Sequence, residues 1–146
     1  MRIAIDCDHG AFDLKNVLVK HLQEHGHEVR DFGTYTRESC DYPDYATFAA
    51  KAVSLGICDR GIVLCTTGIG VSIAANKVDG IRCALLGDVL SAKMTRLHND
   101  TNMMALGAGI VGQNLAIEIV DIWLDTEFSH EEKHRRRIEK VMDLEK

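Results

Sequence analysis

Apolar positions along this chain follow two alternating patterns. Residues 61–65, Gly-Ile-Val-Leu-Cys, form a continuous apolar run, which is typical of a central parallel strand buried on both faces. Residues 12–25 instead place Leu14, Leu18 and Leu22 on one face at helical spacing. The first pattern predicts a strand and the second predicts an amphipathic helix.

The two patterns alternate from one end of the chain to the other. We expect strands at residues 2–6, 28–32, 61–65, 82–86 and 103–106, and helices at residues 12–25, 45–55, 70–76, 89–97, 112–124 and 131–144. This alternation predicts an α/β fold: a Rossmann-like (flavodoxin-like) five-stranded parallel sheet with helices on both faces and an extra C-terminal helix. The 146 residues contain no internal repeat or linker, so a single domain over residues 1–146 is expected.

Composition narrows the class of protein. With 46% apolar and 27% charged residues, the chain is typical of a globular protein and not of a disordered one. Its 22 acidic residues against 17 Lys and Arg give a net charge of −5, which argues against a nucleic-acid partner. No stretch approaches the roughly 20 apolar residues that cross a bilayer, so no membrane association is expected.

The N-terminus and the cysteines indicate a cytoplasmic protein. The N-terminal segment reaches an acid at Asp6, which is not the pattern of a signal peptide. The five cysteines are an odd number and contain no CxxC pair, which argues against a disulfide framework and against a zinc ribbon.

Candidate chemistry is expected where the strands end, because ligands of open parallel sheets bind beyond the carboxyl ends of the strands. The first such loop is Asp6-Cys7-Asp8-His9-Gly10. An Asp-x-Asp pair at this place also occurs in aspartyl-phosphate phosphatases, where one Asp is the nucleophile and the next is an acid. The plainer interpretation is structural, with the Asp8 carboxylate accepting N–H groups at the first helical turn.

The second loop is Cys65-Thr66-Thr67-Gly68-Ile69-Gly70-Val71-Ser72. Its glycines allow backbone N–H groups to converge on an anion at the start of a helix. It is neither the dinucleotide-binding fingerprint, which needs a third glycine, nor a P-loop, which needs Gly-Lys-Ser/Thr. A thiol beside converging N–H dipoles ionises readily, so we expect Cys65 to act as a base. The alternative is that Cys65 is an ordinary buried residue at a strand end.

Two further segments carry titratable groups. His98 is flanked by Asn99 and Asp100, so it can act as a general acid/base, although the same residues suit a solvated helix end with Asn99 in a left-handed turn. In the last helix, Lys133 and Arg137 are i, i+4 neighbours able to hold one phosphate together. A basic run balanced by nearby acids is, alternatively, simply solvated.

Together these segments resemble the ribose-5-phosphate isomerase type B family, which also contains the galactose-6-phosphate isomerase subunits. The resemblance covers nearly the whole chain. It is carried by Asp8-His9, Asp41-Tyr42-Pro43, Cys65-x-Thr67-Gly68-x-Gly70-x-Ser72-Ile73-Ala74-Ala75-Asn76-Lys77, Arg96-x-His98-Asn99-Asp100-x-Asn102 and His134-x-x-Arg137.

The resemblance implies an enzyme of carbohydrate metabolism, an aldose–ketose isomerase that works through a cis-enediolate without metal or organic cofactor. Its substrates would be ribose 5-phosphate and ribulose 5-phosphate, as in the pentose phosphate pathway, or a related tetrose, pentose or hexose phosphate. In this pattern Cys65 is the base and Thr67 assists it. The enediolate is stabilised by the backbone N–H groups of Gly68, Ile69, Gly70, Val71 and Ser72.

The remaining roles in the family pattern concern the rest of the substrate. His98, together with Asp8, opens the sugar ring. The hydroxyls are held by Tyr42 and Asn99, and the phosphate by His9, Lys133 and Arg137. The resemblance also implies a homodimer, often paired into a tetramer, whose active site is shared across the interface, so that the Cys65 and His98 of one site come from different chains.

Three positions depart from the family pattern. Thr66 and Gly109 stand where many members have Gly and a phosphate-binding Arg, respectively, and Lys133 stands where many have Arg. A Lys keeps the charge but loses the bidentate fork of Arg. These departures leave open a different chain length, a different phosphate position or an acidic sugar without phosphate.

Two other functions stay open from the residues alone. One is an aspartyl-phosphate phosphatase that uses Asp6 and Asp8, and the other is a non-catalytic sugar-phosphate binding module. Proton exchange at C2 of a sugar phosphate in deuterated buffer requires a base, so a mere binder is expected to show none.

Overall fold

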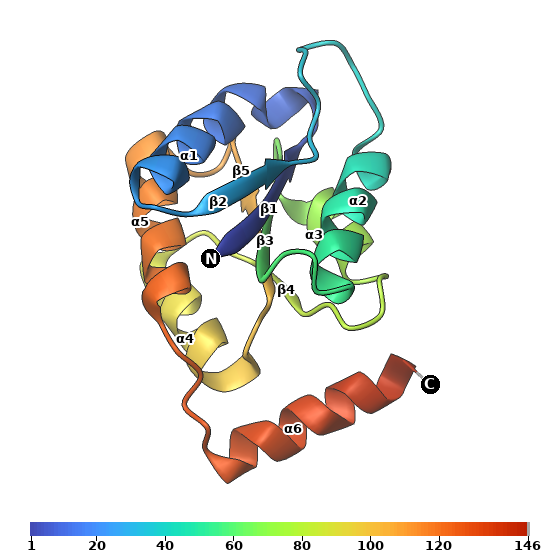
Figure 1. Ribbon diagram of the computed structural model, residues 1–146, viewed down its shortest axis with the longest axis vertical. Helices are drawn as coiled ribbons and strands as arrows, with labels where there is room; N and C mark the ends of the chain where they lie inside the picture. The colour runs from blue at the N-terminus through green and yellow to red at the C-terminus, as the bar shows by residue number, and fades with distance from the viewer. Residues whose placement is uncertain (146) are drawn as a thin grey trace.

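The computed structural model describes residues 1–145 as one sheet covered by helices on both faces (Figure 1). The strands are β1 (Arg2–Cys7), β2 (Glu28–Asp31), β3 (Arg60–Cys65), β4 (Cys83–Leu85) and β5 (Met103–Gly107). The helices are α1 (Phe12–Glu24), α2 (Tyr42–Ser54), α3 (Ile69–Ala75), α4 (Val89–Asn99), α5 (Gln113–Asp125) and α6 (Glu132–Met142), with 3₁₀ turns η1 (His9–Ala11) and η2 (Asp143–Glu145).

Every strand pairing in the sheet is parallel, and the strand order is β2-β1-β3-β5-β4. The prediction of a Rossmann-like, five-stranded parallel sheet is therefore confirmed, as is each expected element to within a few residues. Compared with the flavodoxin-like order 2-1-3-4-5, the last two strands are exchanged, so that β5 lies inside the sheet and β4 forms its edge.

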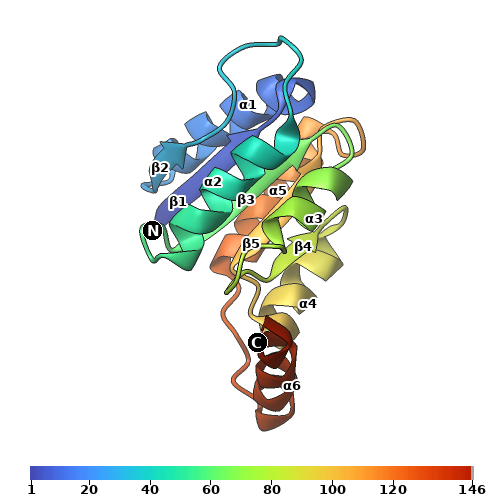
Figure 2. The same ribbon diagram turned by 90° about the vertical axis from the view of Figure 1, so that its right-hand side faces the viewer.

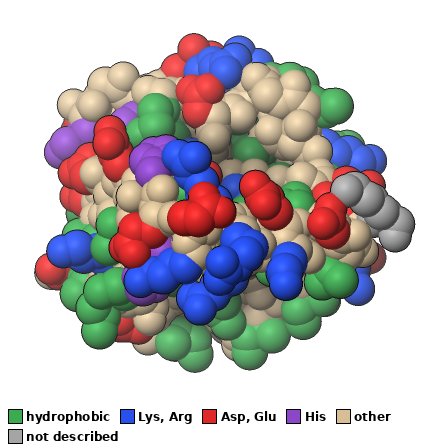
Figure 3. All heavy atoms as spheres, turned by 90° about the horizontal axis from the view of Figure 1, so that it is seen from below, with side chains coloured by type: hydrophobic (Ala, Val, Ile, Leu, Met, Phe, Trp, Pro, Cys, Tyr) green, Lys and Arg blue, Asp and Glu red, His purple; other side chains and the backbone are tan. Residues whose placement is uncertain are grey.

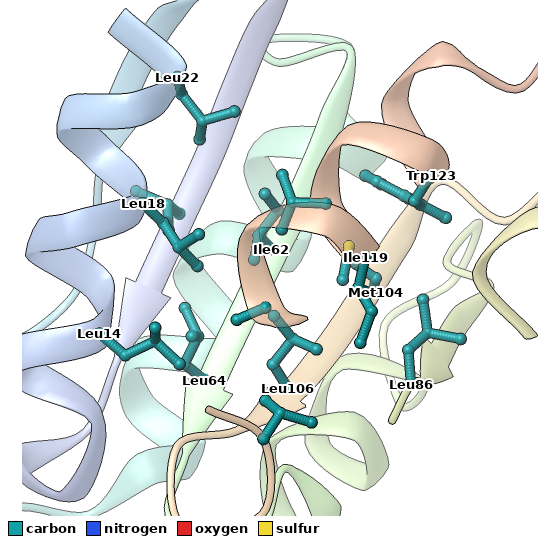
Figure 4. Packing of buried hydrophobic residues seen from close by; sticks show 14 of the residues in the cluster. Leu14, Leu18, Leu22, Ile62, Leu64, Leu86, Met104, Leu106, Ile119 and Trp123 are labelled. Atoms are coloured by element: carbon teal, nitrogen blue, oxygen red, sulfur yellow. The ribbon is translucent and has the colours of Figure 1, made fainter. Parts of the chain in front are cut away.

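Two apolar cores lie on the two faces of the sheet. Figure 2 shows α2 and α3 on one side of the sheet and α1 and α5 on the other. On one face, side chains of β1, β3 and β5 such as Ile62, Leu64 and Met104 pack against α1 and α5, with Trp123 completely buried (Figure 4). On the other face, α2 and α3 cover the sheet with small side chains, of which Ala49 is one. Because successive strand residues point to opposite faces, a continuous apolar run serves both cores.

The start of α2 differs from the expected residues 45–55. The helix begins three residues earlier, at Tyr42, with Pro43 in its first turn. Proline suits this place because its fixed φ matches the helix and its missing N–H is not needed there. Tyr42, expected in a loop, is therefore the first residue of a helix.

The end of α4 also differs from the expectation. The helix continues to Asn99, and the left-handed residue that terminates it is Asp100, with φ of 45°, and not Asn99. Asp tolerates this conformation better than most residues.

Helix α6 lies apart from the layered body, off the end of the sheet at which the strands begin (Figure 1). It packs against α4. Among the residues described, no helix combines the length and the apolar character that a membrane span needs.

Candidate active site

The loops that follow β1, β3 and β5 meet at the carboxyl edge of the sheet. The register pairs Cys7 with Leu64 and Cys65 with Gly107, so these three strands end at the same level. The Ala108 N–H donates to the Cys65 carbonyl over 2.9 Å, which ties the β5 loop to the β3 loop. We call the expected site residues gathered here the carboxyl-edge group: Asp8, His9, Tyr42, Cys65, Thr67, Gly68, Ile69, Gly70, Val71 and Ser72.

The Cys65 thiol lies directly under the turn that opens α3. The backbone N–H of Gly68 donates to Cys65 Sγ over 3.1 Å, and the Cys65 residue is 6% exposed. The hydroxyl of Thr67 accepts the N–H of Ile69 at 3.3 Å, and the Ser72 hydroxyl donates to the Ile69 carbonyl at 2.7 Å. A backbone N–H is thus aimed at the Cys65 sulfur at the point where α3 begins.

Two glycines in this turn are required by their surroundings. Gly68 has φ of 76°, and a Cβ there would lie 2.8 Å from the Leu106 carbonyl carbon and 2.9 Å from the Gly107 nitrogen. A Cβ on Gly70 would lie 2.6 Å from the ring of Tyr42. The glycines therefore allow α3 to start against β5 and allow Tyr42 to lie over the turn.

Asp8 and His9 complete the group from the β1 side. The Asp8 carboxylate accepts the Gly10 N–H at 2.9 Å, which confirms its capping role, and the residue is buried. His9 Nδ1 accepts the backbone N–H of Cys40 at 3.2 Å. Because Nδ1 is an acceptor, the neutral ring carries its proton on Nε2, where it is available to an anion. Cys40 had no sequence signal, since only the fold brings its loop to His9.

Two of the positions that depart from the family pattern touch each other. The Gly109 N–H donates to the Thr66 carbonyl at 2.8 Å. A Cβ on Gly109 would lie 3.1 Å from both the Thr66 methyl group and its carbonyl oxygen. The Thr66 hydroxyl also occupies the place that a Cβ on Gly10 would take. A threonine at position 66 and a glycine at position 109 therefore fit together sterically.

The second set of expected residues, which we call the amino-edge group, comprises His98, Asn99, Lys133 and Arg137. His98, Asn99 and Arg137 line a cavity of about 520 Å³ between α4, α6 and the start of β4. Seen from the side of α6, basic side chains form a band with acidic side chains along one side of it (Figure 3). Lys133 is not free for a phosphate in this arrangement, because its ammonium pairs with the Glu131 carboxylate at 2.9 Å.

Two arginines hold the turn that presents His98. Arg82 donates to the Asn99 carbonyl at 3.0 Å and to the Asp100 carbonyl at 2.7 Å. Arg96, which is 5% exposed, donates to the Thr101 carbonyl at 2.6 Å. The sequence did not identify either arginine as functional, because an Arg that holds a turn is recognised only from the carbonyl groups that surround it.

The two groups lie at opposite ends of the sheet. The cavity of the amino-edge group is lined by Cys83, which pairs with Met103 at the start of β5, whereas Cys65 pairs with Gly107 at its end. Four residues of strand at about 3.3 Å each separate the two levels by roughly 13 Å. The fold thus brings together each half of the expected site, and within one chain it keeps the halves apart.

Asp6 is unsuited to be a nucleophile. It is completely buried on the face of the sheet that α2 covers, and burial raises the pKa of its carboxyl well above the usual range. A carboxyl that substrate cannot reach is unable to attack a phosphate ester. This geometry disfavours the aspartyl-phosphate phosphatase.

Known proteins resemble this chain over nearly its whole length. The family model described as Ribose/Galactose Isomerase matches residues 3–141. The chain is 46% identical over 144 residues to ribose-5-phosphate isomerase B of Escherichia coli (strain K12), with 99% of this chain and 96% of that protein covered. It is 42% identical over 151 residues to D-erythrulose-4-phosphate isomerase of Pectobacterium atrosepticum, with 92% and 99% covered. The structure of Clostridium thermocellum ribose-5-phosphate isomerase B matches with a TM-score of 0.97 and 50% identity over 99% of this chain and 97% of that one.

Proposed function

The chain belongs to the ribose/galactose isomerase family, and we propose that its carboxyl-edge and amino-edge groups together form the active site of this isomerase. The protein is an enzyme, an aldose–ketose isomerase of phosphorylated sugars. The roles of the individual residues, the second subunit and the identity of the sugar are our proposals.

Cys65 is the base that moves the proton between C1 and C2. The observation that carries this proposal is the hydrogen bond from the Gly68 N–H to Cys65 Sγ, which aims a backbone donor at the sulfur where α3 begins. The same turn, from Gly68 to Ser72, supplies N–H groups for the enediolate oxygens, whose charge develops only as the proton leaves. Thr67 is held beside this turn through its hydroxyl, and there it assists Cys65.

The rest of the substrate is held by both groups. His98 and Asp8 open the sugar ring, and Tyr42 and Asn99 bind hydroxyls. His9 binds the phosphate through Nε2, together with Arg137 and with Lys133 once it leaves Glu131. No metal or organic cofactor takes part in the proposed mechanism.

A second copy of the chain completes the site. The roughly 13 Å between the two levels is too far for one small sugar to touch Cys65 and His98 of the same chain. A two-fold dimer places the amino-edge group of one protomer against the carboxyl-edge group of its partner. We propose a homodimer, which can pair into a tetramer, of single-domain chains in the cytoplasm.

Among the sugar phosphates, we propose short ones as substrates. Gly109 supplies no cation, and Thr66 fills the space beside it. We propose four- and five-carbon sugar phosphates, such as erythrulose 4-phosphate and ribulose 5-phosphate, as substrates.

The test is the substitution Cys65→Ala, assayed with both sugars. We expect isomerisation to fall by about a thousandfold, because general-base catalysis is removed. Deuterium exchange at the carbon next to the carbonyl, followed by NMR, should stop as well. Cys58→Ala is the matched control, since Cys58 is a buried cysteine outside the site. Near-normal turnover by a folded Cys65→Ala protein would show that another group is the base. A folded wild-type protein that binds the sugars without exchange would instead be a binding module.

A further inference from the structure

His134 is the one residue that the structure buries in α6. It is 5% exposed, although its neighbours Lys133 and Arg135 are exposed. His134 lies on the face of α6 that also carries Ile138 and Val141, and all three residues line the cavity against α4. Within residues 1–145, His134 Nε2 has no hydrogen-bond partner, so the ring is not held through that nitrogen. What the imidazole does contact is another imidazole.

The rings of His134 and His98 are stacked. Their centroids are 4.3 Å apart and their planes are inclined by 17°. His98 lies in the last turn of α4 and is exposed, so His134 covers one face of its ring and leaves the remainder accessible. A side chain with two rotatable bonds is oriented when one of its faces is covered in this way.

We propose that His134 is a positioning residue for His98: by stacking on it, His134 holds the imidazole at the angle from which His98 opens the ring of a cyclic sugar phosphate. This inference rests on the proposed function, in which His98 performs ring opening. His134 itself touches no reacting atom in that step.

The charges around the pair support this division of roles. Burial lowers the pKa of His134, and the positive charge of His98 lowers it further. Of the other charged groups around His134, Glu131 raises its pKa, whereas Lys133 and Arg137 lower it. Arg82 lines the same cavity. Burial and the charge of His98 both favour the neutral form of His134, and a neutral aromatic face tolerates a charged or an uncharged neighbour.

Sugar chemistry separates ring opening from isomerisation. A five-carbon aldose phosphorylated at C5 closes a ring through its C4 hydroxyl, so an enzyme must open it first. The corresponding ketose has its C5 oxygen blocked by phosphate and stays open. Removal of a C1 proton from the open ketose therefore needs Cys65 and not His98, whereas turnover of the cyclic aldose needs both.

The experiment compares His134→Ala, His134→Phe and the exposed control Arg136→Ala in the full-length protein. With ribose 5-phosphate, His134→Ala is expected to lower kcat about tenfold or more, a fraction of what general acid/base catalysis contributes. Deuterium exchange at C1 of ribulose 5-phosphate should stay within about twofold of wild type, because the open ketose bypasses the ring step. His134→Phe, which keeps a flat ring against His98, should restore most of the aldose rate, and Arg136→Ala should change neither rate.

Three results would overturn the inference. A purely structural role would loosen α6 and move Arg137, which would raise KM for both sugars and slow the exchange as well. Equal loss in His134→Phe and His134→Ala would show that stacking is not what matters. If His98→Asn kept the full aldose rate, His134 would have nothing to position, and the ring-opening step of the proposed function would fail with it. Loss of exchange in Cys65→Ala would still support the isomerase.

Discussion

The carboxyl-edge and amino-edge groups are built in different ways. Around Cys65 the essential contacts come from the backbone: an N–H on the thiol, and glycines that let two loops and a tyrosine ring approach. Around His98 they come from long side chains, namely Arg82 and Arg96 on carbonyl groups and His134 on the ring itself.

This difference matches the chemistry assigned to each half. An enediolate develops charge at fixed positions, and preorganised backbone dipoles stabilise it without having to move. Ring opening requires a side chain that gains and loses a proton, and its neighbours must tolerate both states. In the carboxyl-edge group, an added side-chain atom would displace the backbone donors. In the amino-edge group, one side chain can be replaced by another without moving the backbone.

The largest expected effect on activity comes from combining a substitution in the carboxyl-edge group with one in the amino-edge group. Cys65→Ala and His98→Asn homodimers should each be nearly inactive with ribose 5-phosphate. A heterodimer of the two variants, purified through two different tags, contains one site with both residues intact. It should regain about half of the wild-type activity per dimer.

A heterodimer as inactive as its parents would place Cys65 and His98 of one site in the same chain. The control is a heterodimer of wild-type and Cys65→Ala chains, which should also show about half of the activity, since it too has one complete site.

The next effect should come from Gly68→Ala in the carboxyl-edge group. A left-handed residue with a Cβ costs about 1–2 kcal/mol, and the clash with the backbone of β5 adds to this. We expect at least about 2 kcal/mol lower unfolding free energy in urea and at least a hundredfold lower kcat, because the N–H donors shift.

Gly112→Ala is the matched control for Gly68→Ala. Gly112 has φ of −71° and open space where a Cβ would stand, so its stability should stay within about 0.5 kcal/mol of wild type. Equal effects of the two substitutions would contradict the assigned role of the turn.

The smallest effect is a pH dependence in the amino-edge group. The pKa of His134 is lowered below its usual 6.5 in the folded protein, so below about pH 6.5 the unfolded chain binds a proton more readily than the folded one. The stability associated with neutral His134 is complete above pH 6.5 and is lost as the pH falls through the lowered pKa. Between pH 5 and 8, the melting temperature of His134→Phe should fall less with decreasing pH than that of the wild type. If the two melting temperatures fell in parallel, the pH dependence would not come from His134.

The fold could be predicted to a large extent because its signals are local. The apolar run at residues 61–65 and the spacing of Leu14, Leu18 and Leu22 depend only on near neighbours, and the structure places β3 and α1 there. The start of α2 was missed because Pro43 reads equally well as part of a loop. Most of the carboxyl-edge group could also be found, since Cys65 and its glycines are contiguous in sequence.

What could not be predicted depends on contacts between distant segments. The stacking of His134 on His98 and the Cys40 contact with His9 each join residues whose sequence surroundings look like exposed polar chain. The residues next to His98 and His134 in the sequence do not indicate that the two rings stack on each other.

The sequence by itself determined the elements, the parallel α/β class and the chemistry of the Cys65 loop, because periodicity, turn residues and a short motif are properties of neighbouring positions. Only the tertiary structure decided that β5 lies between β3 and β4, and that Thr66 contacts Gly109. It also decided that His98 stacks on His134 at the end of the sheet opposite Cys65. The physical reason is that packing selects among many pairings of similar local cost, and the selection depends on shapes and charges far apart in the chain.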